Sequence, residues 1–361
     1  MMGPTARIDL AALRHNLQKA RDFVPGSRVY AVIKSNAYGH GMLRVAPYLA
    51  GADALAVARV EEAVKLRQAG VDLPLLVLEG FYDAAELEAA AHYQLEVAVH
   101  QQEQIDILRQ RRLTHPIVCW LKVDSGMHRL GFQPAAVEGA WQALQSDPSV
   151  AAGVRLMTHL SSADDLNDPT TSAQLATFRP FVERFRTPCS IANSAGIIGW
   201  PAAKSDWIRP GIMLYGASPM LGQTGEQIGL KPVMSLQSRL IAINHFAKGS
   251  PIGYSGNWVC PEDMPVGVVA AGYGDGYPRH APSGTPVLLN GSRVPLIGRV
   301  SMDMLTVDLR SQPAARLGDP VTLWGEGLPA EVVAHQAGTI AYELFCGVTQ
   351  RVLFEEINGS R

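Results

Sequence analysis

Polar side chains recur where short apolar runs end in the first 216 residues of this 361-residue chain. They are Lys34, Lys122, Asp124, Arg129, His159, Asn193, Ser194 and Arg209. Each one alone is typical of a charge at a strand end, whereas the whole set indicates a chemical site. Lys34 is the strongest candidate, because a lysine in a desolvated site loses basicity and becomes an amine nucleophile or a proton-transferring base. The polar, glycine-flanked segment NAYGHG (36–41) after it favours this interpretation over a lysine paired with an acid.

A second group of residues is typical of a phosphate site. Ser194 and the pair Gly211-Ile212 follow the last two apolar runs, where loops of a barrel often present amide groups to an anion. Ser194 can also act as the N-cap of a helix that begins in AGIIGW. A phosphate site opposite a reactive lysine fits a pyridoxal phosphate enzyme, because this cofactor needs both features.

The elements that position these residues alternate along the chain. Eight Val/Ile/Leu-rich runs without polar alternation predict parallel strands buried on both faces: 29–34, 54–58, 73–80, 95–100, 116–124, 154–160, 189–194 and 207–216. Helix-like stretches such as 59–70 and 83–93 separate them. Eight βα units predict an α/β fold with a (β/α)8 barrel, and an open doubly wound sheet is the alternative. The polar side chains would then gather at the carboxyl ends of the strands.

The second part of the chain has a different texture. After residue 228, Pro and Gly become dense and runs such as 235–243, 267–273, 285–290 and 319–325 predict short strands. We therefore expect a barrel domain over 10–228 and a mostly-β domain over 229–361, with residues 1–9 as a candidate addition to the β domain. The N-terminal twenty residues are typical of an amphipathic helix and not of a signal peptide.

Composition excludes several classes of protein. Lys and Arg total 31 against 33 acids, a net charge of −2, which argues against a nucleic-acid or anionic-membrane partner. No apolar run approaches the roughly 20 residues that a membrane span needs. The four cysteines, Cys119, Cys189, Cys260 and Cys346, lie far apart, so a disulfide scaffold is not expected and a cytoplasmic location fits best.

A series of motifs extends this interpretation over nearly the whole chain. The segments, in order, are AVIKSNAYGHG, LKVDSGMHRLGF, THLSSAD, NSAG, IRPGIMLYG, PIGYSG, GYGDGYPR, GRVSMDM and AYEL. Together they resemble the motif series of bacterial alanine racemases. The resemblance implies a pyridoxal phosphate barrel with a C-terminal β domain, working as a homodimer with shared active sites that interconverts L- and D-alanine. Ser35 and His128 depart from the residues common in the family.

The resemblance also implies roles in proton transfer. Lys34 resembles the lysine that binds the cofactor and acts as the base on D-alanine. Tyr254 resembles the base that acts on L-alanine from the opposite face. Arg209 is similar to the partner of the pyridine nitrogen, and His159 to the group that couples Arg209 to Tyr254. A tyrosine with an ordinary pKa is a poor base at neutral pH, so a cationic neighbour is needed.

Binding roles follow from the same resemblance. The residues that resemble the phosphate cradle are Tyr38, Ser194, Gly211, Ile212 and Tyr342. Arg129 and the backbone amide of Met302 resemble the site for the substrate carboxylate. Lys122 is similar to a lysine that the family often carries as a carbamate beside this arginine. Tyr273 resembles an aromatic residue of a narrow access corridor for small substrates.

Two other classes of function stay open at this stage. A pyridoxal phosphate decarboxylase of similar two-domain plan would use a C-terminal cysteine, for which Cys346 is the only candidate. A non-catalytic carrier of the cofactor would need only a single barrel, and the β domain argues against it. We expect no metal site, because His40, His159, Asp164 and Asp165 lack the spacing of known ligand motifs. The sequence does not separate a racemase that supplies D-alanine for peptidoglycan from one that serves alanine catabolism.

Overall fold

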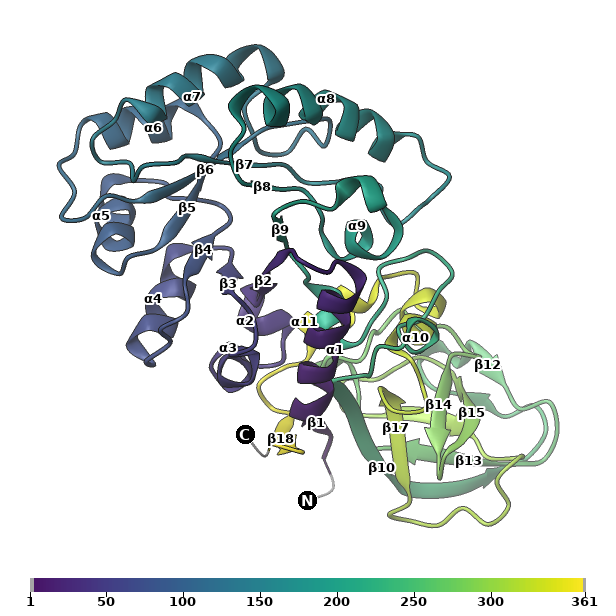
Figure 1. Cartoon of the computed structure of the whole chain (residues 1–361). Coiled ribbons are helices and arrows are strands. Elements are labelled where there is room, and N and C mark those ends of the chain that lie inside the picture. Colours follow the sequence, from purple (N-terminus) through teal and green to yellow (C-terminus); the bar gives the residue numbers. More distant parts are fainter. Residues whose placement is uncertain (1–2, 360–361) are drawn as a thin grey trace. The chain divides into compact units, whose positions relative to one another are not determined.

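The computed structural model describes residues 3–359, which divide into two compact units. One unit, the barrel unit, comprises residues 14–214 and 218–223. The other, the β unit, comprises the described residues up to 13, residues 215–217 and those from 224 onward. Each unit is described by itself below, with the element labels of Figure 1.

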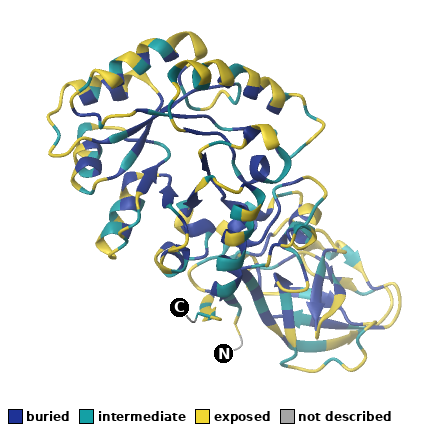
Figure 2. Cartoon of the chain, viewed as in Figure 1, coloured by how far each residue is buried: buried dark blue, intermediate teal, exposed yellow. Residues whose placement is uncertain are grey.

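Eight parallel strands of the barrel unit form a closed barrel. The strands are β2 (Arg28–Val32), β3 (Ala54–Val57), β4 (Leu75–Val77), β5 (Glu96–Val99), β6 (Val118–Lys122), β7 (Arg155–Met157), β8 (Cys189–Ser190) and β9 (Trp207–Ile208). The circle closes where Arg28 of β2 pairs with Trp207 of β9. All residues of β3 and β4 are buried, as Figure 2 shows by colour. The predicted (β/α)8 barrel is confirmed, with each of the eight apolar runs contributing one strand.

Helical segments follow most of the strands. The barrel unit contains α2 (Lys34–Tyr38), α3 (Met42–Val45), α4 (Val60–Gln68), α5 (Ala84–His92), α6 (Gln102–Arg109), α7 (Val137–Gln145), α8 (Thr170–Phe185), α9 (Ser194–Gly199) and most of α1 (Leu10–Phe23). Local sequence explains where they begin. The Asp83 carboxylate, for example, accepts the Glu86 amide at 2.9 Å and caps α5.

Aromatic rings and one ion pair fill the amino-terminal half of the barrel. Tyr30 stacks on Trp207 with ring centroids 4.2 Å apart and meets Trp120 edge-on at 5.6 Å. The Glu96 carboxylate accepts the Tyr30 hydroxyl and, at 2.8 Å, the Trp120 indole N–H. An Arg155 guanidinium nitrogen lies 3.1 Å from the same carboxylate. This plug closes the amino end of the barrel, so chemistry is left to its carboxyl end, which we call the mouth.

The β unit is built on one eight-stranded sheet in the order β13-β16-β15-β14-β17-β10-β1-β18. The strands are β1 (Thr5–Asp9), β10 (Met234–Phe246), β13 (Met264–Val269), β14 (Pro286–Leu289), β15 (Ser292–Ile297), β16 (Leu305–Asp308), β17 (Pro320–Trp324) and β18 (Leu353–Ile357). The long β10 also pairs with β13, across a register shift between Leu240 and Ala242. The predicted mostly-β character is confirmed.

Smaller elements complete this unit, and one of our expectations at the N-terminus is wrong. A ribbon of β11 (Pro251–Ile252) and β12 (Trp258–Val259) precedes β13, and helices α10 (Ala330–Gln336) and α11 (Ala341–Gly347) precede β18. Residues 5–9 form β1, antiparallel to β10 and parallel to β18, and the amphipathic helix starts only at Leu10. Arg7 and Asp9 flank the fully buried Ile8, which is the period-2 pattern of a strand.

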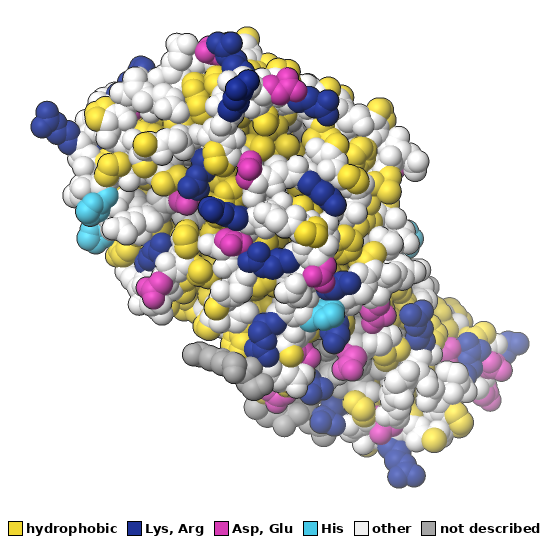
Figure 3. Space-filling model, in the orientation of Figure 1, with side chains coloured by type: hydrophobic (Ala, Val, Ile, Leu, Met, Phe, Trp, Pro, Cys, Tyr) yellow, Lys and Arg dark blue, Asp and Glu magenta, His cyan; other side chains and the backbone are white. Residues whose placement is uncertain are grey.

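The visible surface carries charges of both signs. Figure 3 shows Lys and Arg side chains interspersed with Asp and Glu on the face in view, in keeping with the net charge of −2. Among the described residues, no helix is long and apolar enough to cross a membrane.

Candidate active site

Five cationic or titratable side chains gather at the barrel mouth. They are Lys34, Lys122, Arg129, His159 and Arg209. Lys122 is the last residue of β6, Lys34 and His159 lie two residues beyond β2 and β7, and Arg209 directly follows β9. The charges of Arg209, Arg129 and Lys34 all act on Lys122 and on His159. The barrel therefore brings together five predicted site residues from four strands, in a positive field suited to anions.

Arg209 is fixed by the barrel itself. Its side chain is buried, and the guanidinium donates to the Thr158 and Ile191 carbonyls and to the Ser190 hydroxyl. The Ile191 bond is 3.1 Å long. Burial lowers the pKa of Arg209 to about 10, so the group stays charged at neutral pH.

Lys122 and His159 respond to the same field. Burial, followed by the charges of Arg209, Arg129 and Lys34, lowers the pKa of Lys122 to about 8. Burial, followed by the charges of Arg209, Lys122, Arg129 and Lys34, holds the pKa of His159 well below its usual range, so His159 is neutral at pH 7. Of the predicted His159–Arg209 pair, Arg209 alone carries positive charge at pH 7.

Arg129 lies in a loop that one carboxylate organises. The buried Asp124 accepts the amides of Gly126 and His128 at 3.0 and 2.9 Å, the His128 ring nitrogen at 3.0 Å and the Gln133 amide at 2.8 Å. These bonds close the segment between β6 and Arg129, with His128 at φ 56°. Asp124 thus has a positioning role in this loop.

Three predicted phosphate residues meet at the mouth. The buried Ser194 hydroxyl oxygen accepts the Gly211 amide at 2.9 Å and the Met213 amide at 3.4 Å. A Cβ atom at Gly211 would lie 2.4 Å from the Tyr38 hydroxyl, so only glycine allows this approach. Hydroxyl groups and amides close together are the donors that a phosphate prefers. The interpretation of Ser194 as a helix cap is wrong, because Asn193 caps α9 by accepting the Gly196 amide at 2.9 Å.

The backbone that joins Lys34 to Tyr38 has an unusual conformation. The segment labelled α2 is a left-handed turn, with φ of 53, 52, 56 and 51° at Ser35, Asn36, Ala37 and Tyr38. Left-handed helix costs roughly 1–2 kcal/mol per non-glycine residue, and runs of it are rare. Such strain persists only where the surroundings impose it, and it concentrates at functional sites.

Two side chains impose this turn from its ends. The fully buried His40 ring places Nδ1 3.0 Å from both the Ala37 and the Tyr38 carbonyl oxygens. Burial lowers the pKa of His40 to about 4, so the ring is neutral and Nδ1–H donates. At the other end, the Glu62 carboxylate of α4 accepts the Ser35 amide at 2.7 Å.

The other predicted site residues belong to the β unit. Tyr254, Tyr273 and Met302 are exposed by 65%, 37% and 53%, which is high for such side chains. Tyr273 and Met302 are brought together, because the Tyr273 amide donates to the Ser301 carbonyl at 3.0 Å and the Gly274 amide to that of Met302 at 2.8 Å. Tyr342 is half-buried on α11.

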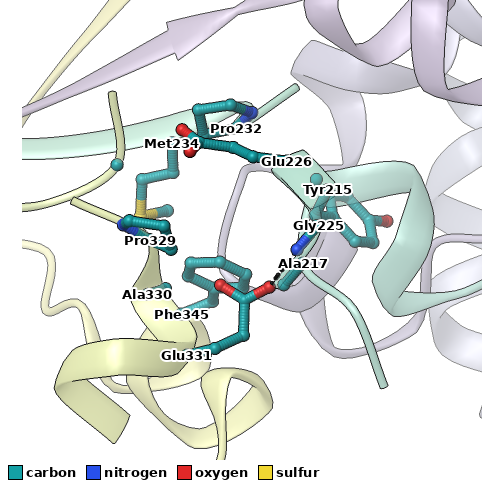
Figure 4. A pocket seen from close by; sticks show the side chains of 12 residues that line it. Tyr215, Ala217, Gly225, Glu226, Pro232, Met234, Pro329, Ala330, Glu331 and Phe345 are labelled. Carbon is teal, nitrogen blue, oxygen red and sulfur yellow. Dashed lines mark hydrogen bonds between the residues drawn. The ribbon is translucent and has the colours of Figure 1, made fainter. Parts of the chain in front are cut away.

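An enclosed hollow in the β unit is not a site for this chemistry. Figure 4 shows it lined by side chains such as Tyr215, Met234 and Phe345, with the Gly225 amide donating to Glu331 at 2.7 Å. Its interior of about 10 Å³ is close to the minimum for a single water molecule. The barrel mouth is the place where the candidate residues of the barrel unit converge.

Comparison with known proteins agrees with this geometry. A family model described as the N-terminal domain of alanine racemase matches residues 8–219, and one for the C-terminal domain matches residues 233–355. The chain belongs to the alanine racemase family. The resemblance noted in the sequence is thereby confirmed, as is the prediction of an enzyme of this family, in preference to a decarboxylase or a carrier.

Relatives of the family match the chain over almost its full length. The alanine racemase of Nitrosococcus oceani is 55% identical over 97% of this chain and 98% of its own length. That of Halorhodospira halophila is 51% identical over 98% of both. The crystal structure of biosynthetic alanine racemase from Pseudomonas aeruginosa matches with a TM-score of 0.97 at 44% identity, over 99% of this chain and 100% of that one. The alanine racemase structure from Acinetobacter baumannii matches with a TM-score of 0.93 at 34% identity, over 99% of this chain and 100% of that one.

Several supporting residues of this family member could not be found from the sequence. Arg351 lies 2.7 Å from both Asp275 and Asp303 and ties the Tyr273 turn to the Met302 loop. Nothing in the spacing of these residues links them, since Arg351 is 48 positions from Asp303. For Glu62, the sequence indicated only an acidic residue in the first turn of a predicted helix.

Proposed function

We propose that this enzyme uses pyridoxal phosphate to interconvert L- and D-alanine. The observation that carries the proposal is the convergence, at one barrel mouth, of Lys34, four further basic side chains and the hydroxyl groups next to Gly211. A phosphate-bearing aldehyde needs an amine and an anion cradle together, and these residues fit both needs. The named activity of the relatives supports alanine as the substrate.

The residues of the barrel unit would hold the cofactor. Lys34 would bind it covalently, Tyr38, Ser194, Gly211 and Ile212 would hold its phosphate, and Tyr342 of the β unit would join them. The Arg209 guanidinium, which stays charged, would face the pyridine nitrogen and keep it unprotonated. When bound, the cofactor supplies an electron sink that makes the Cα proton of the amino acid removable.

Racemisation requires that a proton leaves one face of Cα and returns to the other. Two bases on opposite faces accomplish this without either one moving. Lys34 would hold or accept the proton on the D face at Nζ, and Tyr254 on the L face at its hydroxyl oxygen. Arg209, acting through the neutral His159, would provide the positive charge that lowers the pKa of the tyrosine.

Substrate binding would use the anion site beside Lys122. Arg129 and the Met302 amide would hold the substrate carboxylate, and Tyr273 would narrow the access to small side chains. Lys122, with a pKa of about 8, has an appreciable neutral fraction at pH 7 to 8, which is the form that reacts with carbon dioxide. A carbamate there would supply a negative charge to hold Arg129. We place the enzyme in the cytoplasm, as a homodimer.

Incubation with L-alanine and chiral analysis of the products test the proposal. We expect D-alanine, whereas release of carbon dioxide would indicate a decarboxylase and no change would indicate a carrier. Lys34→Ala should reduce activity to background and remove the borohydride-reducible cofactor bond, while Lys65→Ala, at an exposed helix position, should change neither. A reducible bond that persists in Lys34→Ala would contradict the assignment.

The tyrosine base has its own test. Tyr254→Phe should lower the rate roughly 10²–10⁴-fold, the usual range for removal of a general base. Exchange of the Cα proton with solvent should survive better from D-alanine than from L-alanine, because Lys34 remains. Tyr82→Phe, at another exposed tyrosine, is the matched control. Equal loss from both enantiomers would count against Tyr254 as the L-specific base.

A further inference from the structure

The Glu62 carboxylate serves two segments at once. Its Oε2 atom accepts the Ala58 amide at 2.8 Å and the Arg59 amide at 3.3 Å, where β3 leads into α4. Its Oε1 atom accepts the Ser35 amide at 2.7 Å, 27 positions away in the chain. The first pair of bonds is ordinary helix capping. The Ser35 bond lies outside the helix and contributes nothing to its cap.

Ser35 is the first left-handed residue of the turn and directly follows Lys34. The direction in which a side chain leaves the backbone depends on the φ and ψ angles around it. The Ser35 amide belongs to the peptide unit that joins Lys34 to Ser35, so the bond to Glu62 fixes the orientation of that unit. The direction of the Lys34 side chain is thereby set by a backbone segment that is held by α4, a packed helix.

We propose that Glu62 is a positioning residue that sets the direction of the Lys34 side chain by holding the Ser35 amide. This inference rests on the proposed function, in which Lys34 binds pyridoxal phosphate. Glu62 does not touch the reacting atoms in this role. It links the backbone next to the cofactor lysine to the strand-to-helix junction of the next βα unit. The position of Lys34 is thereby fixed relative to the barrel wall.

The variant Glu62→Gln tests this role without changing the size of the side chain. An amide has one accepting oxygen, so it cannot serve Ser35 and the Ala58–Arg59 pair together. Glu61→Gln is the matched control, because it removes the same charge from the neighbouring, exposed position of the same helix turn. Circular dichroism melting of both variants checks that the fold is kept, and Glu62→Asp provides a second, milder variant with the same charge.

Two probes separate the aim of Lys34 from the phosphate cradle. The affinity for pyridoxal phosphate depends both on the bond to Lys34 and on the phosphate cradle. Pyridoxamine phosphate lacks the aldehyde, so its affinity depends on the cradle and not on a bond to Lys34. For Glu62→Gln we expect the dissociation constant of pyridoxal phosphate to rise at least tenfold, with slower formation of the reducible bond. The constant for pyridoxamine phosphate should stay within twofold of the parent, and Glu61→Gln should match the parent with both probes. A further change of Ser35→Gly, which removes the steric bias against the left-handed turn, should recover part of the affinity for pyridoxal phosphate.

Three results would overturn the role of Glu62. They are unchanged binding of pyridoxal phosphate by Glu62→Gln, an equal loss of affinity for both probes, and no recovery on adding Ser35→Gly. A parent chain that forms no reducible bond at Lys34 would overturn the proposed function and this inference together. A parent that forms the bond, with a variant that forms it equally well, overturns only the role of Glu62.

Discussion

Lys122 shows how the barrel mouth changes the chemistry of a single residue. Its ammonium group is buried among three other cationic side chains, which lowers its pKa to about 8. The sequence identified Lys122 as a residue at the end of an apolar run. It could not reveal the lowered pKa, because burial and the distances to Arg209, Arg129 and Lys34 exist only in the folded barrel.

The cost of this buried charge is measurable. In buffer freed of carbon dioxide, Lys122→Met should raise the free energy of unfolding at pH 7 by roughly 3 kcal/mol, because the pKa falls from 10.5 to about 8 and one pKa unit corresponds to about 1.4 kcal/mol. Between pH 8 and 10.5 the unfolded chain binds the Lys122 proton more tightly than the folded chain does, so the stability of the parent rises with pH. The advantage of Met should therefore shrink across that window. Urea unfolding checks it, with the exposed Lys65→Met as a control that should show no gain.

At the scale of elements, the sequence predicted the barrel strands but not two short strands of the β unit or the left-handed turn after β2. The strands β2 to β9 were predicted because continuous apolar runs that alternate with helices are typical of parallel strands buried on both faces. The strands β15 and β16 were missed, since Pro295 interrupts one and the polar Thr306 and Asp308 break the apolar run of the other. The left-handed turn after β2 was also missed, because local propensity assigns such angles to glycine, whereas contacts in the folded chain, among them those of Glu62 and His40, impose them here on other residues.

The turn should make the enzyme sensitive to acid through His40. The pKa of His40 is about 4 in the folded chain, below the usual 6.5. Between pH 4 and pH 6.5 this histidine is therefore protonated in the unfolded chain and neutral in the folded chain. Stability from this group is complete above pH 6.5 and falls by up to about 1.4 kcal/mol per pH unit toward pH 4. His40→Asn keeps a side-chain donor but does not titrate, so it should flatten this slope. Urea unfolding from pH 7 to 4 measures it, and the exposed His115→Asn should leave the slope as in the parent.

The aromatic plug at the amino end of the barrel depends on one carboxylate. Glu96→Gln removes the partner of Arg155 and weakens the bonds to Tyr30 and Trp120. Because the pair is largely buried, with 23% and 12% exposure of its two side chains, we expect a loss of roughly 2–4 kcal/mol in the free energy of unfolding. Glu88→Gln at an exposed pair 3.9 Å from Arg111 should cost less than about 1 kcal/mol. Equal effects of the two changes in chemical unfolding would contradict the structural role of the plug.

At the scale of the whole molecule, the candidate residues are divided between the two compact units. Lys34, Arg129 and Arg209 come from the barrel unit, and Tyr254 and Met302 from the β unit. In the dimer that we propose, the β unit of each chain completes the site on the barrel of the other. The exposed Tyr254 and Met302 side chains support this arrangement, because they are typical of interface residues.

Mixing two inactive chains tests the shared site. In a dimer of one Lys34→Ala chain and one Tyr254→Phe chain, one site carries both changes and the other carries neither. Random pairing makes half the dimers mixed, and each has one intact site, so about a quarter of the parent activity should return. Sites built within single chains would give no recovery. Subunit exchange, followed with two different tags, is the control that makes a flat result decisive against sharing.

The bond between Ser35 and Glu62 also bears on the order in which the chain is made. Ser35 leaves the ribosome 27 residues before its acceptor. A nascent chain that stops short of α4 therefore contains the nucleophilic amine but lacks the carboxylate that holds the peptide next to it. On the proposed function, abortive translation products of this length carry Lys34 without the contact that we propose sets its direction, because this contact can form only after α4 has been synthesised and folded.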